Sequence, residues 1–191
     1  PIYSKVILDK LVDLKADGTF RLDMQYFDYC TGLRMTAKKF NELFGGLPRK
    51  PEEPLTQKHM DLAASIQWIT EEIVLRLTRS LSSETSSKNL CLAGGVALNC
   101  VANGRVLRDG KFEKIYVQPA AGDAGGALGA ALAVYYSHLG MPRRATGKDA
   151  MSGSFLGPDY DNSEIEQQLT AAGARFEKLD DAELFAATVD A

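Results

Sequence analysis

Two clusters of small residues carry the strongest signal for binding chemistry in this sequence: Gly94 with Gly95, and the glycines of residues 122–126. Each cluster directly follows a short apolar run and opens a helical pattern. At a junction of this kind the backbone can approach a ligand, and the unpaired N–H groups of the first helical turn point at it. Two such junctions in succession predict a site for an anion or a nucleotide.

Polar side chains stand beside both turns. Asn99 lies one turn into a helix predicted over residues 96–107, and its amide offers a donor and acceptors that suit a ribose or phosphate oxygen. A capping or solvent-facing role is the alternative for this side chain. Asp123 begins the helix after the second turn, where an Asp by itself is a routine N-cap worth about 1 kcal/mol. Asn103 and Arg105 lie within reach of the same cleft, although Arg105 suits a solvent-facing position equally well.

Alternating strands and helices must position these residues. The apolar run 90–93 predicts a strand buried on both faces, and residues 115–117 predict a second strand. The second turn leads into a helix predicted over 124–139. Glycine inside a helix costs up to about 1 kcal/mol relative to alanine. We therefore expect another backbone or a ligand to approach this helix closely at Gly125, Gly126 and Gly129.

The first part of the chain is mainly helical by its hydrophobic periodicity. Helices are predicted over residues 4–14 and 37–44 and from Thr56 to about Leu81, and a strand is predicted over 20–24. The longest helix has a predicted buried stripe made of Leu62, Ile66, Ile69, Ile73 and Leu77. His59 lies in its first turn and favours a packing or surface role over metal binding, because no second ligand follows at helical spacing.

The last part of the chain predicts a helix over 164–172, capped at Asn162 or Ser163, a strand over 174–179 and a final helix capped by Asp180. The chain starts directly before a helical pattern, and the final helix has no stop signal. We therefore expect the 191 residues to be a fragment of a longer protein.

Composition limits the class of protein. The net charge is −3, so no basic surplus exists to neutralise the phosphates of a nucleic acid. No apolar run approaches the roughly 20 residues of a membrane span, and no signal peptide is visible. Three cysteines without CxxC spacing, Cys30, Cys91 and Cys100, favour a reducing compartment and buried thiols. We therefore expect a cytoplasmic protein with no nucleic-acid or membrane partner.

Two nucleotide-binding classes and the α/β-hydrolases are excluded because their motifs do not occur in the sequence. The first turn reads GGVALN, which lacks the G-x-G-x-x-G spacing of a dinucleotide-binding Rossmann unit. No GxxxxGK[ST] loop and no GxSxG elbow occurs. The order strand, Gly-Gly turn, helix and then a helix rich in small residues fits the actin-like ATPase architecture.

Two blocks carry a family resemblance, LAGGVALNCVANGRVL and VQPAAGDAGGALGAAL. Together with the upstream blocks YFDY, FNELFG and LTQKHMDLAASIQWITEE, they resemble the O-carbamoyltransferases of the NodU/CmcH type. The resemblance covers most of the chain. It implies an α/β fold, a lobe of an actin-like (ribonuclease H-like) ATPase with a mixed sheet flanked by helices. Residues 1–150 would be the second lobe, and residues 151–191 a linker and the start of a carbamoyl-phosphate-processing domain.

The resemblance also implies an activity. Such proteins use ATP and carbamoyl phosphate, form a carbamoyl-adenylate and pass the carbamoyl group to a hydroxyl of a small-molecule or saccharide acceptor. Carried over by motif, Gly94, Gly95 and Asn99 would contact the adenylate, and Asp123 would bind a divalent metal, iron or magnesium. No catalytic side chain is assigned by this comparison. A homodimer is an assembly compatible with it.

Two parts of the family pattern are missing from the sequence. The HxxxH pair that supplies further metal ligands does not occur, and neither does the arginine-rich carbamoyl-phosphate block. We therefore expect the isolated chain to have no turnover. The alternatives are a phosphotransferase of the same actin-like architecture, which would need no carbamoyl phosphate, and a non-catalytic interaction lobe.

Overall fold

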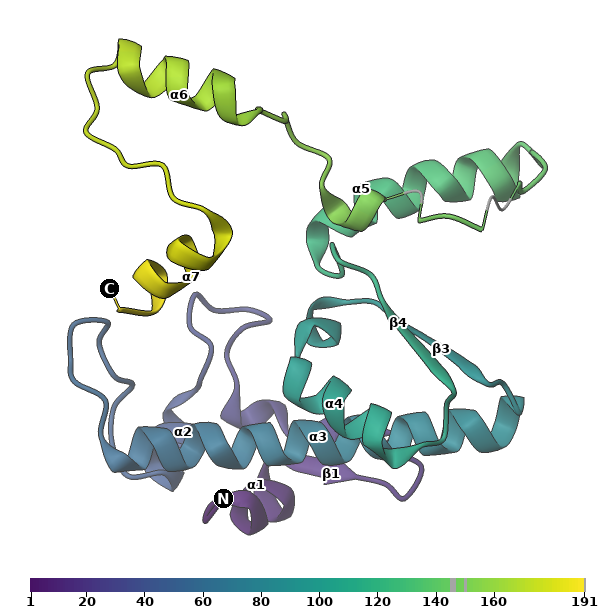
Figure 1. Ribbon diagram of the computed structural model, residues 1–191. Helices are drawn as coiled ribbons and strands as arrows, with labels where there is room; N and C mark the ends of the chain where they lie inside the picture. Colours follow the sequence, from purple (N-terminus) through teal and green to yellow (C-terminus); the bar gives the residue numbers. More distant parts are fainter. Residues whose placement is uncertain (145–146, 150, 191) are drawn as a thin grey trace. The chain divides into compact units, whose positions relative to one another are not determined.

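The computed structural model describes residues 1–144, 147–149 and 151–190. The chain divides into two units, Pro1–Arg143 and Arg144–Ala191. The predicted domain boundary falls at Ala150, which lies outside the described residues. The structure is α/β, rich in helices and with small sheets (Figure 1). Among the described residues, the strands form two two-stranded sheets, one antiparallel and one parallel.

The first sheet is an antiparallel hairpin. The elements of this region are α1 (Ser4–Lys10), β1 (Val12–Leu14), β2 (Phe20–Leu22), the 3-10 turn η1 (Met24–Tyr26) and α2 (Lys38–Leu43). Val12 pairs with Leu22 in the ladder, so the predicted helix over 4–14 is wrong for its last residues. Their backbone groups bond to the neighbouring strand instead, which leaves the Val12 side chain buried.

Helix α3 (Gln57–Thr85) is the longest element, with 29 residues. It begins after Thr56, as predicted, and continues past the predicted end at Leu81. The backbone N–H of Thr56 donates to Nδ1 of His59 at 3.1 Å, as part of a capping box that closes the start of the helix. His59 therefore has a local structural role, in line with the packing or surface role expected for it.

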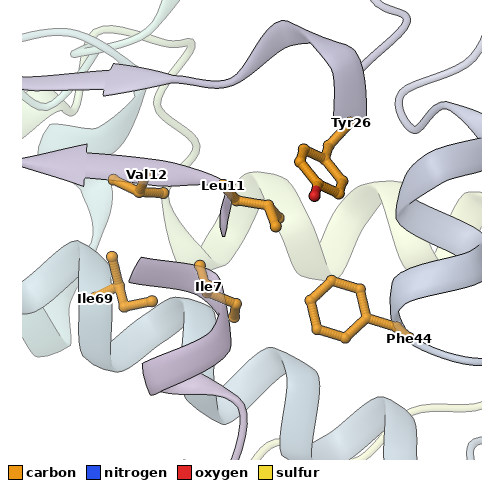
Figure 2. Packing of buried hydrophobic residues seen from close by; sticks show 6 residues of the cluster. All are labelled: Ile7, Leu11, Val12, Tyr26, Phe44 and Ile69. Carbon is orange, nitrogen blue, oxygen red and sulfur yellow. The ribbon is translucent and has the colours of Figure 1, made fainter. Parts of the chain in front are cut away.

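Helix α3 joins two hydrophobic clusters. In the first, Ile69 packs with Ile7, Leu11, Val12, Tyr26 and Phe44 (Figure 2). In the second, Leu75 packs with Leu90, Val106 and Phe112. Fully burying one such side chain contributes about 1.5–3 kcal/mol, so α3 is a large part of what holds this unit together.

The predicted buried stripe of α3 is wrong at two of its positions. Ile66 is 46% exposed and Leu77 is 40% exposed, whereas Ile69 is buried. The helix contacts α1 on one face and α4 on another, so its buried positions do not follow a single stripe. Those positions are Ser65, Ile69, Leu75 and Thr78.

The second sheet is parallel and carries the two predicted turns. Its region comprises β3 (Asn89–Leu92), the 3-10 turn η2 (Gly95–Leu98), α4 (Cys100–Asp109) and β4 (Lys114–Val117). Leu90 is buried in the second cluster, but Cys91 on the opposite face is exposed. The prediction of a strand buried on both faces is therefore wrong. The prediction of buried thiols is wrong too, because Cys30, Cys91 and Cys100 are all exposed.

The glycine-rich helix follows the second turn. Helix α5 (Asp123–Leu132) continues directly into a π-helical segment, η3 (Ala133–His138), so the helix predicted over 124–139 is confirmed. A Cβ at Gly125 would collide with the carbonyl oxygen of Ala120, which is the expected close backbone approach. Nothing described lies within 4 Å of a Cβ built at Gly126 or Gly129, so the same expectation is not met there.

The second unit contains the short turn η4 (Ser152–Ser154) and two helices, α6 (Asn162–Ala171) and α7 (Asp181–Asp190). Asp161, not the predicted Asn162 or Ser163, caps α6 in a capping box with Glu164. The strand predicted over 174–179 is not formed. In the part of the chain that the structure describes, no helix has the length and apolar character needed to cross a membrane.

Candidate functional site

The two predicted turns lie next to each other at one edge of the parallel sheet. Strands β3 and β4 run in the same direction with Leu92 beside Val117, so both strands end at this edge. The backbone N–H of Gly94 donates to the carbonyl oxygen of Ala121 at 2.8 Å and joins the two turns directly. Ligands of open α/β sheets bind at such carboxyl ends. The geometry thus brings Gly94 and Gly95 close to the start of α5.

The first turn is open to a ligand. Gly94 has φ 97° and ψ 160°, a conformation that is essentially restricted to glycine. Gly95 begins the 3-10 turn and has no positive φ. A Cβ at either position would meet no atom within 4 Å, so both backbones face open space. The need for glycine at position 94 is therefore conformational, while the space beside Gly95 is free for another molecule.

Asn99 occupies a different position from the one predicted. The helix predicted over 96–107 begins only at Cys100, because the 3-10 turn precedes it, and Asn99 is the N-cap of α4. Its Oδ1 accepts a hydrogen bond from the backbone N–H of Ala102 at 3.1 Å. Asn is among the most favoured N-cap residues, so this is the capping alternative that the sequence left open.

A glutamine from α3 also holds Asn99. Nε2 of Gln67 donates to Oδ1 of Asn99 at 3.1 Å, and Nδ2 of Asn99 donates back to Oε1 of Gln67 at 2.9 Å. Both side chains are partly buried. Sequence reasoning missed Gln67, because the pair joins positions 32 apart in the chain. The available signal was local: Gln67 and Glu71 stand one helical turn apart and bond to each other at 2.9 Å.

Arg105 and Asn103 support this arrangement from α4. Arg105 donates to Glu71 at 2.9 Å and to Glu72 at 3.3 Å, so it points at α3 and not at the turn. The pKa of Glu71 is lowered from its ordinary value, first by the hydrogen bond from Gln67 and then by Arg105. Nδ2 of Asn103 donates to the carbonyl oxygen of Ala97 at 2.6 Å and so fixes the 3-10 turn.

Asp123 is the first residue of α5, and the N-cap is Gly122. The alternative role of Asp123 as a helix N-cap is therefore wrong by one position. Its side chain is exposed and caps no backbone N–H. Among the described residues, no group of three or more His, Cys, Asp or Glu side chains is arranged to hold a metal ion. Asp123 can therefore supply one carboxylate, but the described residues do not by themselves form a metal site.

A small cavity lies behind the first turn. It has a volume of about 180 Å³ and is lined by residues of α3, β3, the turn and α4, including Leu77, Leu92, Val96 and Asn103. Pockets for small molecules typically measure about 300–1,000 Å³. This cavity alone is therefore too small for a nucleotide.

Comparison with known proteins places this region within a described family. Residues 3–132 match the family model described as "Carbamoyltransferase N-terminus". An uncharacterized protein of Synechocystis sp., sll1178, is 59% identical over 187 residues, which are 97% of this chain and 30% of that protein.

Two nodulation proteins are also similar. NolNO of Sinorhizobium fredii is 45% identical over 130 residues, 68% of this chain and 18% of that protein. NolO of Bradyrhizobium diazoefficiens is 44% identical over 119 residues, 62% of this chain and 21% of that protein. The chain thus spans less than a third of the length of each of these relatives.

The two glycines of the first turn should respond differently to substitution. Gly94→Ala should lower the free energy of unfolding by about 1–3 kcal/mol, because alanine disfavours the backbone conformation at this position. Gly95→Ala is the matched control and should change it by about 0.5 kcal/mol or less. Urea unfolding of both variants measures the difference. Equal losses would show that the turn does not have the conformation described.

Proposed function

Since the chain belongs to the carbamoyltransferase family, as its N-terminal domain, we propose that it is part of an ATP-dependent carbamoyltransferase. The carbamoyl group of carbamoyl phosphate is activated as carbamoyl-adenylate and passed to a hydroxyl of a small-molecule or saccharide acceptor. The observation that carries the proposal is the pairing of the two turns through Gly94 and Ala121, inside the segment that matches the family.

The described residues have distinct roles in this proposal. Gly94 and Gly95 let the adenylate approach the backbone, since both face open space. Asn99 contacts the nucleotide from the adjoining N-cap. Asp123 contributes one carboxylate to a divalent metal, iron or magnesium, whose other ligands come from outside the described residues. The role of Asp123 is supported by its exposed side chain at the same sheet edge.

The two units have separate places in the proposed protein. The first unit ends at Arg143 and contains the whole family match, which favours its assignment as the second lobe of an actin-like (ribonuclease H-like) ATPase domain. The second unit lies beyond the match and is proposed to be a linker and the start of a carbamoyl-phosphate-processing domain. Homodimer formation remains a prediction.

The full-length protein should release pyrophosphate from ATP only when carbamoyl phosphate is present, because adenylate formation expels pyrophosphate. An enzyme-coupled pyrophosphate assay measures this without knowledge of the acceptor. Conversion of ATP to ADP that does not depend on carbamoyl phosphate would favour a phosphotransferase instead. A lack of any nucleotide turnover would favour an interaction lobe.

Asp123→Ala in the full-length protein should lower the amount of bound metal, because it removes one carboxylate ligand. Asp181→Ala is a matched control, since Asp181 is also the first residue of an exposed helix but lies in the second unit. Each variant should lose about 0.3–1 kcal/mol of stability from the helix dipole. Elemental analysis of the purified proteins measures the metal. Unchanged metal content in Asp123→Ala would remove Asp123 from the ligand set.

A further inference from the structure

A series of hydrogen bonds that begins at Arg105 on α4 determines which group donates and which accepts in each hydrogen bond of the Asn99 side chain. The guanidinium of Arg105 can only donate, so Glu71 accepts from it at 2.9 Å. The Glu71 side chain is only 12% exposed, and an ionised carboxylate accepts without donating. The group of Gln67 that faces Glu71 must therefore be the N–H side of its amide, as observed at 2.9 Å.

The orientation of the Gln67 amide determines the orientation of the Asn99 amide. With Nε2 turned to Glu71, Oε1 of Gln67 must accept, and it does so from Nδ2 of Asn99 at 2.9 Å. The other end of the Asn99 amide agrees independently. Its Oδ1 faces the backbone N–H of Ala102, which can only donate. Two independent constraints thus set the same orientation of the Asn99 amide.

The Asn99 amide makes three hydrogen bonds to the described residues, and these leave one of its donors unused. Its Oδ1 accepts from Ala102 and from Gln67, which uses both lone pairs. Its Nδ2 carries two hydrogens and gives one of them to Gln67. Within the described part of the chain, the second N–H has no protein acceptor. Asn99 therefore presents a single donor at the N-cap, in the segment that follows the open glycine turn.

We propose that Gln67 is a positioning residue that orients the Asn99 amide, so that Asn99 meets its ligand only as a hydrogen-bond donor to an acceptor oxygen. In a nucleotide this oxygen belongs to a phosphate or to the ribose. The inference rests on the proposed function, in which Asn99 contacts the adenylate. It adds that Asn99 is the donor in that contact and that Gln67 imposes this role.

Three variants of the full-length protein separate this role from helix capping. Asn99→Ser keeps a favoured N-cap, so the thermal midpoint should change little. It removes the amide N–H that is free for a ligand, and its shorter hydroxyl does not take the place of that group. Its Kd for ATP should rise by about tenfold, the cost of one lost hydrogen bond to a charged group. Gln67→Met keeps the length and helix propensity of the side chain and should raise the Kd by a similar factor. Isothermal titration calorimetry with ATP measures each Kd.

The matched control lies on the same helix. Gln57 donates to Asp61 at 3.0 Å with the same four-residue spacing, but it does not contact Asn99. Gln57→Met should therefore leave the Kd for ATP unchanged. An equal loss of affinity in Gln57→Met would show that any disturbance of α3 suffices, and would contradict the proposal.

The double variant gives the sharpest test. If Gln67 acts through Asn99, the combined Gln67→Met and Asn99→Ser protein should bind ATP no more weakly than Asn99→Ser alone. Additive losses would show that Gln67 acts by another route and would overturn the proposal. Repeating the titration with adenosine identifies the oxygen. A loss confined to ATP assigns a phosphate oxygen, whereas an equal loss with both ligands assigns the ribose.

The proposed function and this inference fail in different ways. A wild-type protein that does not bind ATP contradicts the proposed function and the inference with it. A wild-type protein that binds ATP, with an affinity that Asn99→Ser and Gln67→Met leave unchanged, contradicts the inference alone.

Discussion

The parallel pairing of β3 with β4 is the constraint on which the site depends. It places the ends of both strands at one edge of the sheet, where the N–H of Gly94 reaches the carbonyl of Ala121. A shift of the register by one residue would turn Leu90 out of its cluster, because side chains alternate between the two faces of a strand. Burial of Leu90 therefore helps to fix the register, and the register fixes the distance between the two turns.

Helix α3 is the second requirement. It buries Ile69 in one cluster and Leu75 in the other, and between these positions it presents Glu71 to α4. Gln67, two residues before Ile69 on the same helix, reaches the N-cap of α4. Packing and polar contacts thus come from one rigid element. A side chain placed on a long, anchored helix holds its orientation better than one on a loop, which suits the positioning role that we propose for Gln67.

Local signals in the sequence predicted much of this region. The two strands, the two turns and the start of α3 after Thr56 follow from residue types. The position of Asn99 did not follow, because hydrophobic periodicity does not distinguish a 3-10 turn from the first turn of an α-helix. Its partner Gln67 was missed because the contact is not local. The exposure of Ile66 and Leu77 was missed because periodicity does not tell which elements a helix will meet. The family, in contrast, was recognisable from the two glycine blocks together with the upstream blocks, and residues 3–132 match its model.

We propose that the two turns form one nucleotide site in the full-length protein. Hydrogen–deuterium exchange with and without ATP tests it most directly, because backbone amides that bind or are covered by a ligand exchange more slowly. Exchange should slow in residues 93–99 and in residues 120–126 together. Protection of other segments with no change in these two, under conditions where ATP binds, would contradict the claim.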